Sequence, residues 1–476
     1  MLLTILPELS LLFLAILALV FDALWKPDQR RGLGWLTVGG LAAIIILTLL
    51  FSRPGEQPEL IFGGMLNKDW FSFAFKLLFL LGALITAMFV MDMSDVGGRG
   101  EFYALMLVST LGMCLMAASA DLIMLYLAIE ATSIPLYVMA GFMKRDDKST
   151  ESGFKYLLFG MLTSTIMLYG FSLLYGFTGE TNLSELALAF HNADFPIIPV
   201  IGSLLLILVG FGFKISAVPF HFWAPDTYEG APTPVAGFLS TASKAAGFAV
   251  LMRVLIEVFS PVVLTQWTTI LAVISVMTMT LGNAFALAQH NIKRLLAYSS
   301  IAHAGYILIG VVAFSQLGVT SAIFYLAVYL VTNLAAFGIV VIFWRTTGSD
   351  EISSYAGLNR RAPGLALALM IAMLSLAGMP PLGGFVAKVF VFAAAVQSDY
   401  IWLAVVGVLN SIIGLYYYLT ILKVAYLYRS EDEDKPIPLT RPYAIALTFL
   451  TVGIILLGTL FGPWFNFSNA IAASIF

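Results

Sequence analysis

The sequence predicts an all-α protein that crosses a membrane about fourteen times. Its 476 residues are 60% hydrophobic and 11% charged, whereas soluble globular domains are about 45–50% apolar and about 25% charged. A chain with so few charged residues cannot cover a water-exposed surface, and the mean hydropathy of +0.96 agrees. The apolar residues also gather in runs of the length that crosses a bilayer, roughly 20 residues. The chain is therefore expected to be a polytopic membrane protein.

Each apolar run is expected to form one helix, and the linkers between them are too short for an extramembrane domain. The first run lacks a basic segment and a small-residue cleavage site, so we expect it to be retained. The expected helices are Leu2–Leu24, Leu33–Phe51, Trp70–Val90, Phe102–Ala118, Leu122–Phe142, Phe154–Phe177, Ile197–Phe220, Val235–Phe259, Thr268–Ala288, Leu295–Phe314, Thr320–Trp344, Pro363–Val396, Ile401–Leu427 and Tyr443–Phe461.

Lysine and arginine are concentrated in every second linker. Sixteen of them follow the odd-numbered runs, and only Arg53, Lys68 and Arg253 lie in linkers or run ends on the opposite side. Because positively charged loops stay in the cytoplasm, we expect both termini on the outer side of a bacterial inner membrane. The linker after the seventh run has no basic residue and departs from this pattern.

Composition excludes several classes of function. The net charge of −3 is wrong for a nucleic-acid binder with a basic surface. Cys114 is the only cysteine and the four histidines are scattered, so no metal site or iron–sulfur cluster is expected in this chain. No nucleotide-binding motif is present. Any redox chemistry is therefore expected on partner chains.

Two of the runs are interrupted by residues that end helices. Pro219 in the seventh run is followed by His221–Pro234, and the twelfth run contains Ala377–Gly384, with the sequence AGMPPLGG. Discontinuous helices in related positions are typical of transporter folds built from inverted repeats. Because the breaks lie five runs apart, we expect inverted five-helix repeats at 102–260 and 261–428, after residues 1–101 and before residues 429–476. The alternative is that two kinks arose by chance.

Four charged residues lie well inside the runs, namely Glu130, Lys214, Lys244 and Lys388. Each would cost roughly 2.5–3.5 kcal/mol at the bilayer centre, and together on the order of 10 kcal/mol. They therefore need partners or water, and we predict that they mark a path for protons. The alternative is a set of buried ion pairs that only holds helices together.

The context of Glu130 and Lys214 favours a proton path. Each precedes a proline by five residues, and a proline frees a carbonyl that can hold water. A glutamate beside a lysine stabilises the lysine's charge. Moving or neutralising that glutamate would turn the lysine into a proton donor, so the pair predicts an electrostatic switch that needs no redox group in this chain.

Other polar residues have two interpretations each. Lys155 could extend the path, or its side chain could reach the cytoplasmic surface. His303 could relay protons or be a hydrogen-bonded core histidine. His221 could gate the path or cap the broken helix. Lys76 lies only one and a half turns into the third run, and we expect its side chain to reach the membrane surface.

Several long stretches resemble the antiporter-like membrane subunits of respiratory complex I, the proton-pumping NADH–quinone oxidoreductase. The resemblance extends over essentially the whole chain and is clearest at Glu130 with its proline, Phe213–Lys244 (FKISAVPFHFWAPDTYEGAPTPVAGFLSTASK), His290–Tyr306 (HNIKRLLAYSSIAHAGY) and Leu376–Phe390 (LAGMPPLGGFVAKVF). Within that family the chain is most similar to the subunit N group. It carries lysine at position 388 and ends soon after the fourteenth run.

The resemblance implies fourteen helices with two inverted repeats and a proton-translocating role. It implies that Glu130 pairs with Lys214, that Lys244 is the central lysine and that Lys388 lies on the exit side. We further expect Lys155 and His303 to act as auxiliary relays. It also implies that this chain binds no cofactor itself. NADH, FMN, iron–sulfur clusters and quinone would be bound by partner subunits, and the neighbours would include further antiporter-like subunits and lipid.

Two other functions fit part of the sequence. A subunit of a multisubunit sodium ion/proton antiporter would use the same Glu130, Lys214 and Lys244, so these residues do not separate the two. A substrate transporter that works alone would fit the expected repeats but not the resemblance.

Overall fold

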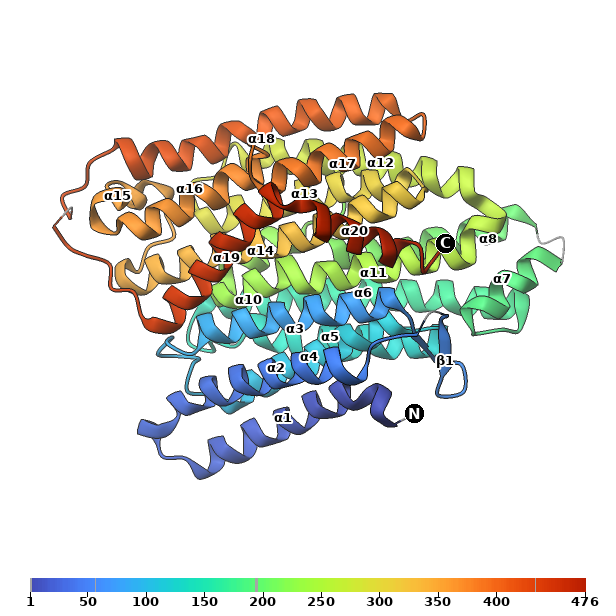
Figure 1. Cartoon of the computed structure of the whole chain (residues 1–476), viewed down its shortest axis with the longest axis horizontal. Helices are drawn as coiled ribbons and strands as arrows, with labels where there is room; N and C mark the ends of the chain where they lie inside the picture. Colours follow the sequence, from blue (N-terminus) through green and yellow to red (C-terminus); the bar gives the residue numbers. More distant parts are fainter. Residues whose placement is uncertain (1, 56, 193–195, 433) are drawn as a thin grey trace.

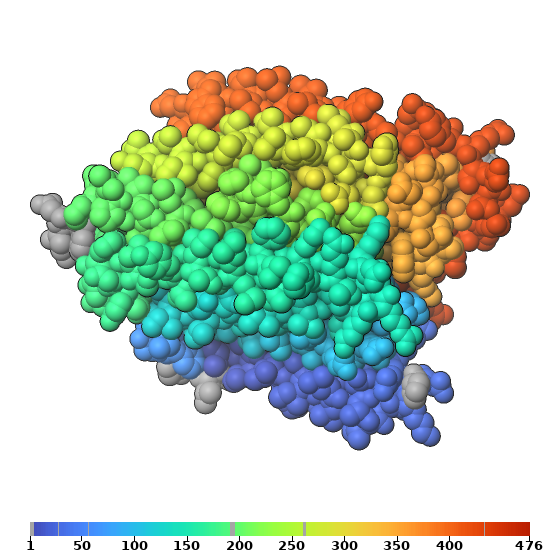
Figure 2. All heavy atoms as spheres, turned by 180° about the vertical axis from the view of Figure 1, so that it is seen from behind, coloured from blue at the N-terminus to red at the C-terminus, as the bar shows by residue number. Residues whose placement is uncertain are grey.

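The computed structural model describes residues 2–55, 57–192, 196–432 and 434–476. The described chain is a bundle of long helices that lie side by side (Figure 1). The N-terminal helices form one edge of the bundle and the helix before the last linker forms the opposite edge, as Figure 2 also shows from behind. The predicted all-α membrane fold is confirmed.

Within these described ranges, twelve helices are long and apolar enough to cross a membrane. They are α1 (Leu6–Leu24), α2 (Arg31–Phe51), α3 (Trp70–Val90), α4 (Gly100–Ala118), α5 (Leu122–Ala140), α6 (Asp147–Thr178), α8 (Ile197–Ile215), α12 (Ser260–Ala286), α13 (Ile292–Val312), α14 (Gln316–Thr347), α18 (Ile401–Leu427) and α19 (Arg441–Thr459).

The other two expected crossings, the eighth and the twelfth, are made of shorter elements. The seventh, α8, is uninterrupted within Ile197–Ile215, and the break expected in that run lies between α8 and α9. The eighth consists of α10 (Thr233–Phe238), a π-helical turn η3 (Leu239–Ser243), α11 (Lys244–Val254) and a second π-helical turn η4 (Leu255–Phe259). The twelfth consists of α16 (Pro363–Ala377) and α17 (Gly383–Gln397), separated at the AGMPPLGG stretch. Added to the twelve uninterrupted helices, these two account for the fourteen expected crossings. The internal repeats stay a prediction.

The linkers contain small elements that hydropathy did not predict. A hairpin pairs β1 (Glu59–Ile61) with β2 (Leu66–Lys68), and α20 (Phe461–Ala472) follows α19. The remaining short elements are α7 (Leu183–Asn192), α9 (Trp223–Gly230), α15 (Leu358–Arg361), η1 (Leu2–Ile5), η2 (Pro27–Gln29) and η5 (Ile352–Tyr355).

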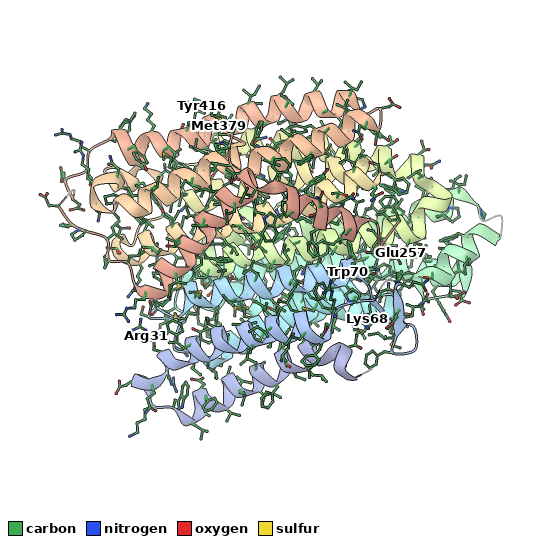
Figure 3. The ribbon with its side chains drawn as sticks, viewed as in Figure 1. Arg31, Lys68, Trp70, Glu257, Met379 and Tyr416 are labelled. Atoms are coloured by element: carbon green, nitrogen blue, oxygen red, sulfur yellow. The ribbon has the colours of Figure 1, made fainter. Side chains whose placement is uncertain are left out.

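The two ends of the bundle differ in composition. One end carries the β1–β2 hairpin, α7 and both termini, and we call it the hairpin end (Figure 1). The other end carries the arginine-rich linkers, with Arg31 labelled there in Figure 3, and we call it the basic end. Both termini therefore lie at the same end, as fourteen crossings require.

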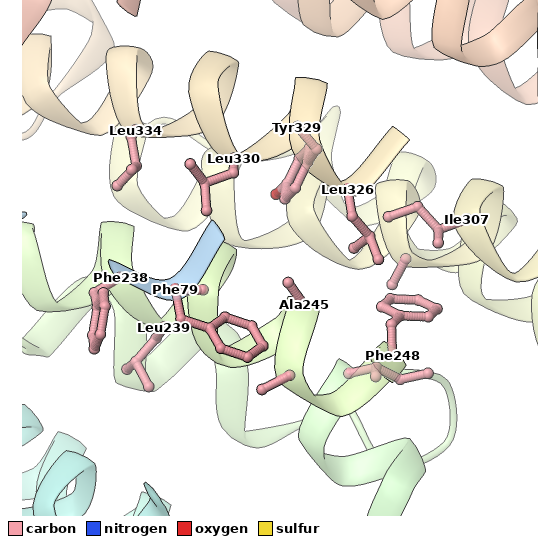
Figure 4. Packing of buried hydrophobic residues seen from close by; sticks show 14 of the residues in the cluster. Phe79, Phe238, Leu239, Ala245, Phe248, Ile307, Leu326, Tyr329, Leu330 and Leu334 are labelled. Atoms are coloured by element: carbon pink, nitrogen blue, oxygen red, sulfur yellow. The ribbon is translucent and has the colours of Figure 1, made fainter. Parts of the chain in front are cut away.

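Helices α13 and α14 lie at the centre of the bundle and are almost wholly buried. Phe79 of α3, Phe238 and Phe248 of the eighth crossing, and Leu330 of α14 belong to one buried hydrophobic cluster (Figure 4). By contrast, α1, α2, α6 and α18 expose leucine, isoleucine and phenylalanine side chains. A face of this kind fits lipid or a partner chain.

Candidate functional site

The first helix break positions Lys214. Helix α8 ends at Ile215. The next residue, Ser216, adopts a left-handed backbone with φ 59°, and α9 starts at Trp223. Lys214 is therefore in the last turn of α8, where unpaired carbonyls and the helix dipole favour a cation. Pro219 lies four residues beyond the helix end. The end of the helix, rather than this proline, leaves carbonyls free near Lys214.

Glu130 and Lys214 come together through α5. The Nζ of Lys214 donates to Ser133 Oγ at 2.8 Å, and Ser133 donates to the carbonyl of Ile129 at 2.7 Å. Glu130 lies one turn before Ser133 and accepts a hydrogen bond from Ser164 of α6. No ion pair within 4.0 Å joins Glu130 and Lys214, both of which are described. Lys214 is instead connected to the helix that carries Glu130 through Ser133.

Lys244 is the first residue of α11, directly after the π-helical turn η3. Its Nζ donates to Ser300 Oγ at 2.5 Å and to the Ser300 carbonyl at 2.8 Å, so it is attached to α13. Single π-helical turns occur often at functional sites. Gly247, one turn later, leaves room for the stem of Lys214 against α11. The first break and the central lysine are thus in contact through one helix.

Lys388 lies at the second break. Helix α16 ends where Gly378 adopts φ 87°. Lys388 of α17 reaches back and donates to the carbonyls of Leu376 and Ala377, each at 3.0 Å, and to Ser411 Oγ at 2.9 Å. Three neutral oxygens therefore hold this buried side chain, and its role on the exit side stays a prediction.

Helix α13 carries the polar groups between Lys244 and Lys388. His303 is buried, with Nδ1 2.8 Å from the Tyr325 hydroxyl and Nε2 3.1 Å from the Tyr418 hydroxyl. The Tyr418 hydroxyl is also 2.5 Å from Ser299 Oγ. Lys388 Nζ lies 4.9 Å from the ring centroid of Tyr306. Both interpretations of His303 fit this geometry, since it is a hydrogen-bonded core histidine situated between the two lysines.

Lys155 lies apart from this row. Its Nζ pairs with Asp226 of α9 and with Glu151, each at 2.6 Å, at the basic end. Arg294 also pairs with Asp226, at 2.8 Å, and with Glu229, at 3.1 Å. The seventh linker lacks basic residues because its carboxylates pair with basic residues from α6 and α13. The proposed relay role of Lys155 stays a prediction.

Asp226 belongs to α9, which is not one of the membrane-spanning helices. Burial raises the pKa of the Asp226 carboxyl, but hydrogen bonds from Lys155 and Arg294 outweigh burial and hold this pKa below its usual value. The cluster is therefore ionised at neutral pH and ties α6, α9 and α13 together.

His221 is buried in the turn between α8 and α9, and its Nδ1 makes no hydrogen bond with the described part of the chain. Its backbone carbonyl accepts from Ala224, as expected of a residue that caps a break. A gating role for the imidazole stays a prediction.

The expectation for Lys76 was wrong. Its side chain is buried and pairs with Glu8 of α1 at 2.5 Å instead of reaching the membrane surface. Hydropathy did not reveal this pair because Glu8 and Lys76 lie 68 positions apart, and only the packing of α1 and α3 against the same neighbours, α2 and α4, brings them together.

The sequence alone did not identify the serines that bind the lysines or the tyrosines that bind His303. Ser133, Ser300, Ser411, Tyr325 and Tyr418 are common residues of membrane helices, and nothing in their spacing marks them. One available signal was the helical spacing of Ser299, Ser300, His303 and Tyr306, which places polar groups along one run. Among the described residues, no group of three or more His, Cys, Asp or Glu could hold a metal ion.

Known proteins with this arrangement are membrane subunits of large complexes. The family described as NADH:quinone oxidoreductase/Mrp antiporter, TM, matches residues 119–414. NADH-quinone oxidoreductase subunit N of Moorella thermoacetica is 42% identical over 451 residues, which are 94% of this chain and 94% of that protein.

Two solved structures are also similar. A chain of respiratory complex I from Thermus thermophilus is 34% identical, with a TM-score of 0.81 over 97% of this chain and 99% of that chain. A chain of the Mrp complex from Dietzia has a TM-score of 0.87 over 100% and 97%, but at 23% identity it shows the fold alone. The chain therefore belongs to the NADH:quinone oxidoreductase/Mrp antiporter transmembrane family, among the NADH-quinone oxidoreductase N subunits.

Proposed function

We propose that this chain translocates protons as a membrane subunit of an NADH–quinone oxidoreductase, coupled to quinone reduction on other subunits. The observation that supports this most is the row Lys214, Lys244 and Lys388. Each of these lysines is buried, and each is held by hydroxyl or carbonyl oxygens rather than by a direct carboxylate partner. Neutral ligands leave a lysine free to give up its proton, whereas a tight ion pair would hold it.

The trigger in this proposal is the separation of Glu130 from Lys214. Ser133 and Ser164 each hold one partner, so a small movement of α5 against α6 or α8 would change the distance between the two charges. A change in the charge on Lys214 would then act on Lys244, because the stem of Lys214 packs against Gly247, one turn after Lys244 on α11. Lys244 would pass its proton along α13 to Lys388, with His303 as a relay.

The auxiliary roles follow the same path. Lys155 would guide protons in from the basic end, where it lies beside Asp226, and His221 would gate the turn at the first break. The basic end would face the cytoplasm and both termini the outer side of a bacterial inner membrane. NADH, FMN, iron–sulfur clusters and quinone would be bound by partner subunits, and further antiporter-like subunits would be neighbours.

The test uses the intact complex with Lys214→Ala or Glu130→Ala. Assembly is checked on a native gel stained for NADH dehydrogenase activity, and proton uptake per NADH is measured in vesicles. Both variants should assemble but lose coupled quinone reduction, while Lys423→Ala, at an exposed position of α18, should behave as the unaltered complex. Normal proton stoichiometry in both assembled variants would refute the mechanism.

The second candidate is a subunit of a sodium ion/proton antiporter, favoured by the fold shared with the Mrp complex of Dietzia. The same gel separates the two functions. Migration in a very large NADH-active band would support the first. A small NADH-inactive assembly would instead call for a measurement of sodium-dependent proton flux.

A further inference from the structure

A second set of buried charges lies at the hairpin end of α11, away from the lysine row. Arg253 is 2% exposed. Its Nη2 donates to Asp69 Oδ2 at 2.8 Å and to the Ala117 carbonyl at 3.0 Å, and its Nη1 donates to Glu257 Oε1 at 2.9 Å. The guanidinium also lies 5.0 Å from the ring centroid of Phe71. One side chain thus joins α11 to the start of α3 and the last turn of α4.

The place of this cluster in the bundle is well defined. Asp69 caps α3 directly after the hairpin, and Glu257 lies in the π-helical turn η4. Figure 3 shows Lys68, Trp70 and Glu257 near one another toward the hairpin end. Arg253 lies on the same helix as Lys244, nine residues farther toward this end, which corresponds to about 13.5 Å along the helix axis.

The stretch between the two cations is apolar. Residues Ala245–Met252 are all buried, and Phe248 packs within the central hydrophobic cluster (Figure 4). Lys244 donates its hydrogen bonds to Ser300 of the neighbouring helix α13. A proton moving from Lys244 toward the hairpin end would therefore cross this apolar stretch and meet the guanidinium before it reached Asp69 or Glu257.

Helix packing alone does not explain a charge at this position. Replacing a buried ion pair by apolar side chains of similar volume is often neutral or stabilising. A fixed positive charge in a membrane pathway, however, is an effective barrier to protons, and an arginine cannot lose its charge at physiological pH.

We propose that Arg253, clamped by Asp69 and Glu257, seals the hairpin end of the first helix break, so that protons on Lys244 leave only along α13 toward Lys388. The purpose of this seal rests on the proposed function. The seal itself is tested separately, because its test measures passive proton leak and not pumping.

The experiment measures passive proton leak through the intact complex in vesicles, without NADH, after a potassium diffusion potential is imposed with valinomycin. Arg253→Gln and Arg253→Met remove the charge and should each raise the leak at least about tenfold, whereas Arg253→Lys should not. Lys76→Met combined with Glu8→Leu removes another buried ion pair, between α1 and α3 and without a residue of α11, and is the matched control. Its leak should equal that of the unaltered complex.

A structural defect is separated from an opened path by a second substitution. Adding Lys244→Leu to Arg253→Gln should restore a tight membrane if the leak runs through the lysine, and should leave a nonspecific hole unchanged. The proposal is overturned if the assembled charge-removing variants leak no more than the Lys76/Glu8 control, if Lys244→Leu leaves their leak unchanged, or if neither variant assembles while Arg253→Lys does. Loss of pumping in Lys214→Ala without any leak would bear on the proposed function alone.

Discussion

The two helix breaks hold their lysines in different ways. At the first break, Lys214 lies in the last turn of the helix that ends there, and its serine ligand belongs to the helix that carries Glu130. At the second break, Lys388 lies on the helix that starts there and reaches back to two carbonyls at the end of α16. Within the part of the chain that the structure describes, only the first lysine has a carboxylate nearby, that of Glu130.

This difference separates a controllable site from a fixed one. Backbone carbonyls at a helix end do not titrate and cannot move far, so the environment of Lys388 is constant. The charge of Glu130 can be moved or neutralised, so the environment of Lys214 is adjustable. We infer that an electrostatic trigger belongs at the first break and that the second break provides a stable end point.

The largest effect is expected at the second break. Lys388→Met removes the group that we propose carries the proton last and should lower NADH-driven proton uptake in vesicles by about 100-fold, the low end of what a positioned acid or base contributes. Ser411→Ala removes one of three ligands and should have a much smaller effect, because two carbonyls remain. Pumping that survives Lys388→Met would show that the two breaks are not in series.

A smaller effect is expected from the trigger. Glu130→Gln keeps the shape of the side chain and the hydrogen bond from Ser164 but removes the charge. It should lower coupled quinone reduction about tenfold, because the interaction energy between two charges separated as Glu130 and Lys214 are is a few kcal/mol at most. Ser164→Ala is the companion variant and should act in the same direction but more weakly. An unchanged rate in Glu130→Gln would mean that both breaks work without a carboxylate.

The tightness of the two breaks can be compared with one alanine at each. A side chain at Gly384 would overlap the backbone carbonyl of Ser375, while one at Gly212 would meet the ring of Phe220, which can move. Gly384→Ala should therefore destabilise the subunit by about 1–3 kcal/mol, and Gly212→Ala by less. Immunoblots of the assembled complex measure this, and equal levels in both variants would contradict it.

The smallest effect is expected at the basic end. Because the pKa of Asp226 lies below its usual value in the folded chain, its ion pairs stabilise the fold at neutral pH and are lost as pH falls through that lowered pKa. Asp226→Asn should remove this acid sensitivity and change stability at neutral pH by under about 1 kcal/mol, since the cluster is partly exposed. Thermal inactivation at pH 7 and at about pH 3, which is below the ordinary Asp pKa of about 3.9, at low and high salt, provides the measurement. An unaltered acid response in the variant would exclude Asp226 as its source.

Hydropathy and charge alone predicted most of the architecture. The start and end of α3 and α18 were predicted to the residue, because a run of about 20 apolar residues in a bilayer has no stable alternative to a helix. The two breaks were visible as Pro and Gly stretches. The charges Glu130, Lys214, Lys244 and Lys388 were visible because they lie inside apolar runs, where charge is so costly in a membrane.

Only the tertiary structure decided the partners of those charges. Ser300, Tyr418 and Ser411 lie on other helices, far along the chain from the lysines or the histidine they hold. The ion pairs of Lys76 with Glu8 and of Arg253 with Asp69 likewise depend on which helices pack together. A sequence reveals that a buried charge needs a partner, but the choice of partner is a property of helix packing, which hydropathy does not encode.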